Sequence, residues 1–164
     1  MLNRATQTRD SAQPARKMSS MDLPAPSLLA GVVLAASLAQ ILSGGACQVV
    51  LSRLPFGRRA SAELATNKVF RRMDSTGMTY VIAGAPFVST LLFLFAYHTL
   101  GCALAVTPLR AALVMWLCGA CHGIFIDHCS IRYSLDVAAF FAASTCASAA
   151  VMGWTVQFAY ERYA

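Results

Sequence analysis

Cysteine and histidine residues stand close together between Leu109 and Ser134, at a spacing that could do chemistry. Cys118, Cys121 and His122 match the Cys-x-x-Cys-His pattern of covalent haem attachment, in which two thiols add to the haem vinyl groups and the histidine binds the iron. The pattern lies inside an apolar run, whereas covalent attachment normally uses a segment exposed to water. A membrane haem protein is therefore the least favoured of three functional interpretations, and no cofactor is favoured.

The same segment offers a second set of metal-binding residue types. Cys118, His122 and Cys129 would fall on one face of a continuous helix, with His128 nearby. Zinc would need a fourth ligand and neighbouring groups that hold the ligands in place, and Cys129 lies beyond the expected end of the helix. We expect no metal site here.

Helix packing explains more of these residues with fewer assumptions. Gly119 and Gly123 are four positions apart, the spacing at which small residues let two membrane helices approach closely. We expect them to form a groove for an alanine stripe of the next helix, which includes Ala139 and Ala143. Further small residues expected at helix contacts are Gly31, Gly44, Gly45 and Gly153.

The apolar runs contain few groups that could act in catalysis or transport. Their interiors hold no Asp, Glu, Lys or Arg, since Arg110 and Asp136 stand at run ends, whereas proton relays and charged-substrate transporters usually carry such groups. The sequence also lacks a nucleophile elbow, a phosphate-binding loop and paired carboxylates. We expect no enzyme and no catalytic residue. Gln40 and Gln48 are expected to hydrogen-bond to neighbouring helices, and His98 and His122 to be hydrogen-bonded histidines, rather than to bind a ligand.

The composition is that of a membrane protein. Of the 164 residues, 57% are hydrophobic and 12% are charged, against roughly 25% charged residues in a soluble domain. The charges gather in the arm, the loops and the tail, so the net charge of +6 describes loop surfaces. We expect anionic phospholipids as partners of these loops and no nucleic acid, because no stretch interleaves aromatic and basic residues on one face.

Four apolar runs predict an all-α integral membrane bundle of four transmembrane helices. The spans are expected over residues 27–52, 77–106, 109–126 and 135–158. They lie in a transmembrane domain of residues 27–160, which follows a polar arm of residues 1–26. Pro86 is expected to kink the second span. Trp154, Tyr160 and Tyr163 are placed like an aromatic belt at the membrane surface.

Residues 53–76 form the one substantial loop between the spans. We expect a solvated basic loop near lipid headgroups, with a short interfacial helix as the alternative, because its apolar residues do not make one clean helical face. Its basic side chains are candidates for binding the headgroups of anionic lipids such as cardiolipin. They are Arg53, Arg58, Arg59, Lys68, Arg71 and Arg72.

Several short motifs resemble a four-helix integral-membrane family of unknown function that is best known from bacteria. They are Gly44-Gly45, Leu54-Pro55-Phe56-Gly57-Arg58, Trp116-Leu117 and Met152-Gly153-Trp154. The resemblance covers roughly residues 28–158 and implies four helices and no established activity. The chain departs from the pattern at Ala60, where an aromatic residue would be expected, and in its Cys-His cluster.

These observations favour a non-catalytic accessory subunit of a multi-subunit complex in the mitochondrial inner membrane. The arm is rich in Arg, Ser and Thr with few acids, which is typical of mitochondrial targeting, and respiratory-chain and ATP synthase complexes contain such subunits. The subunit would pack against core subunits and bind anionic lipid. The alternative is a small stand-alone transporter or lipid-handling protein, which would need a polar cavity near Gln40, Gln48 and His122.

Overall fold

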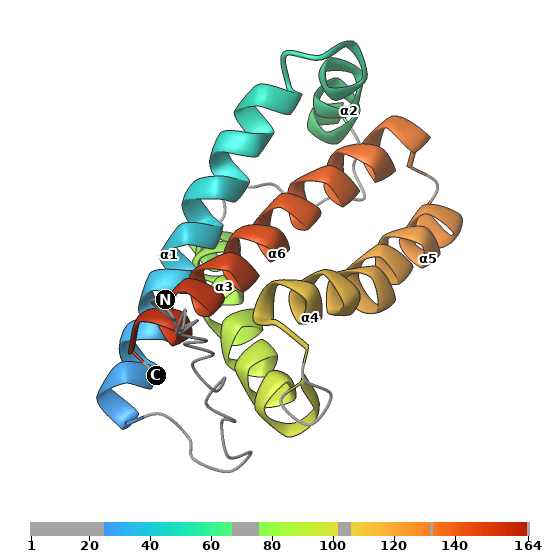
Figure 1. The fold of residues 1–164 in the computed structure, drawn as a ribbon. Coiled ribbons are helices and arrows are strands. Elements are labelled where there is room, and N and C mark those ends of the chain that lie inside the picture. The colour runs from blue at the N-terminus through green and yellow to red at the C-terminus, as the bar shows by residue number, and fades with distance from the viewer. Residues whose placement is uncertain (1–24, 67–75, 102–105, 132, 164) are drawn as a thin grey trace, which may run out of the picture.

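The computed structural model describes residues 25–66, 76–101, 106–131 and 133–163, and every regular element in them is a helix (Figure 1). Two of the elements, η1 and η2, are π-helical turns. The elements are α1 Pro26–Leu51, α2 Pro55–Thr66, α3 Thr76–Ala96, η1 Tyr97–Gly101, α4 Pro108–Met115, η2 Trp116–Cys121, α5 His122–Ile131 and α6 Leu135–Tyr163. Residues 1–24 of the predicted arm lie outside the described residues, as do Lys68, Arg71, Arg72 and Cys102.

Four helical segments are long and apolar enough to cross a membrane, which confirms the predicted integral membrane bundle. They cover Pro26–Leu51, Ala83–Leu100, Pro108–Cys129 and Leu135–Arg162. The third span continues beyond its predicted end at residue 126, because α5 runs through Asp127 and His128 to Ile131. Single polar residues near a span end do not interrupt the backbone hydrogen bonds of a helix.

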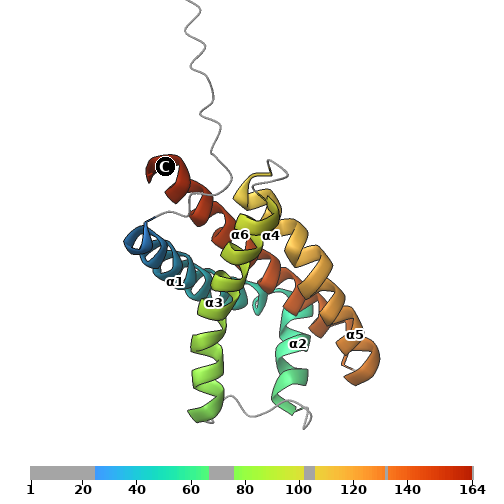
Figure 2. The ribbon, with the colours of Figure 1, turned by 90° about the horizontal axis from the view of Figure 1, so that it is seen from below.

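Helix α6 is the central element of the bundle (Figures 1 and 2). It packs antiparallel to α1 on one side and to α4 on another, while α2 contacts its first turns and α3 packs on α1. The core between these helices is built from buried side chains that include Val32, Phe93, Ala112 and Val156. Lipid tails are as apolar as these side chains, so close packing rather than exclusion of water holds such helices together.

Residues 55–66 form a helix, which corrects the expected solvated loop and agrees with its alternative, a short helix. Phe56, Ala60 and Leu64 recur every four positions and so share one face. That face packs against Val137 and Phe140 near the start of α6. The sequence pattern was misleading because the contact face uses these three residues, while Ala62 and Ala65 are exposed.

Candidate functional site

The third span is held to the bundle mainly through its first half. A Cβ atom added to Gly153 of α6 would lie 2.7 Å from the Ala112 Cβ atom and 2.9 Å from the Leu109 Cα atom of α4, so only glycine allows this approach. One turn further on, the Trp116 indole nitrogen donates a hydrogen bond of 3.0 Å to the Thr145 hydroxyl oxygen of α6. These contacts fix α4 on α6 and position η2 and α5, which follow.

The second half of the third span presents small residues away from the bundle. Added Cβ atoms on Gly119 and Gly123 would meet nothing within 4 Å, and Ala139 of α6 is exposed. The expected groove between these glycines and the alanine stripe of α6 is therefore not formed. The π-helical turn Trp116–Cys121 gives a physical reason, because its extra residue per turn rotates the following residues away from the face that α4 presents to α6.

The other small residues with predicted packing roles also fall into two groups, those at helix contacts and those that are exposed. Gly44 of α1 faces α6, since an added Cβ atom would lie 3.2 Å from the Ser148 hydroxyl oxygen. Gly31 and Gly45 are exposed, with open space where a Cβ atom would be. Ala143 is half-buried on α6. Of the glycines with predicted packing roles, Gly44 and Gly153 therefore lie at close helix contacts.

The cysteine and histidine side chains of the third span are accessible. Cys118 and Cys129 are exposed free thiols, Cys121 is a half-buried free thiol, and His122 is exposed. Across residues 25–66, 76–101, 106–131 and 133–163, the structure brings no three His, Cys, Asp or Glu side chains into one group that could hold a metal ion. Cys118, His122 and Cys129 thus remain apart.

A network of polar side chains joins α1 to α3 inside the membrane-spanning region. The Thr90 hydroxyl donates to the Pro86 carbonyl oxygen at 2.8 Å and accepts a 2.6 Å bond from the Gln40 amide. The Ser37 hydroxyl donates to Thr90 at 3.3 Å, and Ser89 donates to the Gln40 amide oxygen at 3.2 Å. The prediction that Gln40 hydrogen-bonds to a neighbouring helix is confirmed, whereas Gln48, for which the same was expected, is exposed.

An open groove of about 400 Å³ lies between α1 and α3, and apolar side chains such as Leu29, Val33 and Phe87 line it. Gln40 is not among its lining residues. This groove is therefore not the polar cavity near Gln40 that a transporter would need. The Gln40 amide is instead hydrogen-bonded to Thr90 and Ser89.

His98 and Tyr160 form a second polar contact, between η1 and the end of α6. The His98 Nε2 atom and the Tyr160 hydroxyl oxygen are 2.7 Å apart, and either can donate, depending on the tautomer of the imidazole ring. The prediction that His98 is a hydrogen-bonded histidine is confirmed. Tyr160 is 9% exposed and packs in the core, so it does not belong to an aromatic belt, whereas Trp154 is 58% exposed. The side chain of Tyr163 lies outside the description.

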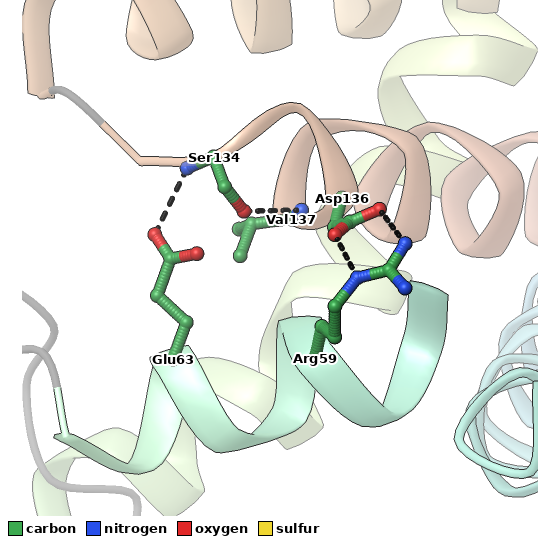
Figure 3. Close-up of polar contacts among 5 residues, drawn as sticks. All are labelled: Arg59, Glu63, Ser134, Asp136 and Val137. Atoms are coloured by element: carbon green, nitrogen blue, oxygen red, sulfur yellow. Dashed lines mark hydrogen bonds and ion pairs between the residues drawn. The ribbon is translucent and has the colours of Figure 1, made fainter. Parts of the chain in front are cut away.

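A polar clamp, formed by Arg59, Glu63, Ser134 and Asp136, fastens α2 to the start of α6 (Figure 3). The Glu63 carboxylate accepts a 2.9 Å bond from the Ser134 backbone N–H group. The Arg59 guanidinium donates two bonds to the Asp136 carboxylate, at 2.6 and 3.1 Å. The hydrogen bond and the negative charge of Asp136 raise the pKa of Arg59.

The clamp separates the predicted lipid-binding residues into two groups. Arg59 is committed to Asp136, although its side chain remains 65% exposed. Arg53 and Arg58 are exposed and form no ion pair within the described residues. Headgroup binding by these arginines stays a prediction.

Tyr133, which lies between α5 and α6, contacts α5, a contact that sequence reasoning did not identify. Its hydroxyl donates a 2.7 Å hydrogen bond to the Ile124 carbonyl oxygen, and its ring lies 5.5 Å from the His128 ring, measured between centroids. Burial of the side chain raises the pKa of Tyr133. Local patterning could not reveal this contact, because it depends on the path of the chain between α5 and α6.

Comparison with protein-family models, curated proteins and solved structures finds no match to this chain. The resemblance to a four-helix membrane family stays a prediction.

Proposed function

We propose that this protein is a non-catalytic structural subunit of a multi-subunit membrane complex, and that its third span contacts a neighbouring subunit. The observation that carries the proposal is the exposed position of His122 within the span Pro108–Cys129, between the open glycines Gly119 and Gly123.

The argument begins with the polarity of His122. Lipid tails offer no hydrogen-bond partner to an imidazole ring, so histidines inside membrane spans almost always face protein or a water-filled space. The bundle does not cover His122. A neighbouring protein helix would supply both a hydrogen-bond partner for the ring and shelter from lipid.

The packing of the spans supports the same conclusion. In an apolar stretch of 18 residues within the third span, 6% of the residues are buried. In the corresponding stretch of the span Leu135–Arg162, 28% are buried. Open glycines such as Gly119 and Gly123 gain little from lipid, but they allow the backbone of a partner helix to approach closely.

The proposed location is the mitochondrial inner membrane, in a respiratory-chain or ATP synthase complex. The basic, hydroxyl-rich composition of residues 1–26 supports this location. Arg53, which precedes α2, and Arg58, within α2, are both exposed and suited to anionic phospholipids such as cardiolipin, which are abundant in that membrane. The subunit would bind these lipids at one membrane surface while its third span packs on the complex.

The test combines native size analysis with substitution at the open glycine. Membranes solubilised in mild detergent should release the wild-type chain in a high-mass complex, and Gly119→Leu should shift it toward the free subunit. Leu92→Ala, at an exposed position of α3, is the control and should leave the complex intact. A wild-type chain that migrates alone, or a Gly119→Leu chain that stays in the complex, would refute the proposal.

A photoreactive amino acid gives a second measurement that does not depend on complex stability. Placed at position 119 in native membranes, it should yield a discrete protein adduct. Placed at position 92, it should yield lipid adducts, because Leu92 of α3 is exposed on another face of the bundle. Lipid adducts alone at both positions would exclude a partner at the third span.

A further inference from the structure

Three side chains form a ladder along one face of α6 near its end. The rings of Trp154 and Phe158 stack with centroids 5.9 Å apart, and the guanidinium carbon of Arg162 lies 5.9 Å from the centre of the Phe158 ring. Trp154 is 58% exposed, Phe158 is 48% exposed, and Arg162 is also exposed. The three residues are four positions apart, so they lie one above another on the helix surface.

The ladder faces away from the bundle. Val156 and Tyr160, which alternate with its members along the chain, are buried in the core shared with α1 and α3. Positions separated by two residues in a helix point in nearly opposite directions, because each residue turns the helix by about 100°. The ladder therefore faces the surroundings of α6, which are lipid for a membrane span.

The order of the side chains fits the boundary between hydrocarbon and headgroups. Trp154 lies within the span, and Arg162 is its last residue, about 12 Å further along the helix axis at 1.5 Å per residue. Tryptophan rings are enriched where the hydrocarbon meets the headgroups, and arginine side chains extend their charge outward while the stem stays on apolar surface. The cation–π contact holds the guanidinium group above the two rings.

The charges near the ladder favour an anion as the ligand. Glu161 is the adjacent acid, and its carboxylate accepts a 2.8 Å hydrogen bond from the Gln157 amide, one turn earlier on α6. Arg162 makes no ion pair with any residue in the described part of the chain. As far as the described residues are concerned, its charge is therefore available to a group outside the protein.

We propose that the ladder of Trp154, Phe158 and Arg162 is a binding site for an anionic phospholipid. Arg162 contacts the headgroup phosphate, and Phe158 and Trp154 pack against the upper part of an acyl chain. The site lies at the opposite end of α6 from Arg53, Arg58 and α2, so it serves the other membrane surface (Figure 1). It does not depend on the proposed complex, because the isolated chain contains every residue involved.

The experiment uses the fluorescence of Trp154 in lipid vesicles. The chain has two tryptophans, so Trp116→Phe leaves Trp154 as the sole emitter. The full chain is reconstituted into phosphatidylcholine vesicles that contain a fixed fraction of phosphatidylglycerol. Bromine atoms, which quench tryptophan on contact, are placed on the acyl chains of one lipid or of the other. The measured quantity is the local fraction of each lipid beside Trp154.

Brominated phosphatidylglycerol should be enriched beside Trp154 by about fivefold over its bulk fraction, the ratio expected for one arginine at an anionic surface. Arg162→Gln should remove the enrichment. Arg58→Gln makes the same charge change at the far end of the molecule and should preserve it. Equal quenching by both lipids would overturn the proposal, as would an enrichment that survives Arg162→Gln or that Arg58→Gln removes equally.

A second design guards against unfolding of the Trp116→Phe variant, since Trp116 bonds to Thr145. The quenching of the chain with both tryptophans is measured, and that of Trp154→Phe is subtracted. Preferential quenching by the anionic lipid should appear in the difference. Its absence there would overturn the proposal in the same way.

Discussion

The Glu63 carboxylate accepts a hydrogen bond from the backbone N–H group of Ser134 at 2.9 Å, across 71 positions of sequence. Ser134 precedes the first residue of α6, and its hydroxyl oxygen accepts a 3.4 Å bond from the N–H group of Val137. In a capping box, a Glu three residues after the cap reaches back to the N–H group of the cap residue. Here that carboxylate comes from α2, so the start of α6 and the position of α2 depend on each other.

Removal of this carboxylate should loosen the start of α6. Glu63→Ala leaves the Ser134 N–H group without its acceptor and should cost about 1 kcal/mol, the usual value of a helix cap. Glu63→Gln keeps an acceptor oxygen and should cost less. Hydrogen exchange of the amides of residues 134–138 in detergent measures the effect. Glu161→Ala, at the other end of the bundle, is the control and should leave these amides protected.

Exchange of the charges in the neighbouring ion pair tests whether α2 is held by attraction to α6. Arg59→Glu should speed proteolysis within α2, because it places a second carboxylate beside Asp136. The double variant Arg59→Glu with Asp136→Arg should restore most of the protection. Arg58→Glu changes the adjacent, exposed residue and should have little effect. If the double variant is cleaved as fast as Arg59→Glu, the pair does not hold α2.

Two glycines that look alike in the sequence should respond in opposite ways to alanine. Gly153→Ala would place a Cβ atom 2.7 Å from the Ala112 Cβ atom, so α4 and α6 must separate, at roughly 1–3 kcal/mol. Gly119→Ala meets nothing within 4 Å and should leave the isolated chain equally or more stable. Thermal unfolding in detergent measures both. Equal destabilisation by the two substitutions would contradict the described packing.

The hydroxyl of Thr90 should stabilise the contact between α1 and α3. Thr90→Val keeps the shape of the side chain but removes the acceptor of the 2.6 Å bond from Gln40, at a cost of roughly 0.6–2 kcal/mol. Thr99→Val is the matched control, since the Thr99 hydroxyl bonds only to carbonyls of its own helix within the described residues. Unfolding in detergent should separate the two variants, and similar midpoints would show that the interhelical bond contributes nothing.

The number of spans and the roles of two isolated polar residues could be predicted from the sequence. A long apolar run without charged residues indicates a membrane span, because a charged side chain inside lipid is costly. Gln40 and His98 were predicted to be hydrogen-bonded on the same physical ground, and the structure gives their partners as Thr90 and Tyr160. The same prediction covered Gln48 and His122, whose side chains are exposed instead.

The faces of the helices could not be predicted in the same way. Gly119 and Gly153 occur in similar small-residue patterns, and a π-helical turn just before α5 rotates one set outward. The clamp of Glu63 on Ser134 joins residues far apart in the chain. Neither feature produces a recognisable pattern in the local sequence. The three-dimensional structure was therefore needed to identify the residues of the candidate site.

The central position of α6 has a consequence for biosynthesis. Spans enter the membrane in chain order, and α6 follows all the other described helices. Until the ribosome has translated α6, α1 can pair with α3, but α4 lacks the partner that meets it at Gly153, and α2 lacks the Ser134 amide. The hairpin of α1 and α3 can form early, while the contacts that α2 and α4 make with α6 wait for the last helix. A nascent chain stalled before Leu135 would therefore display unpaired membrane helices to the quality-control machinery.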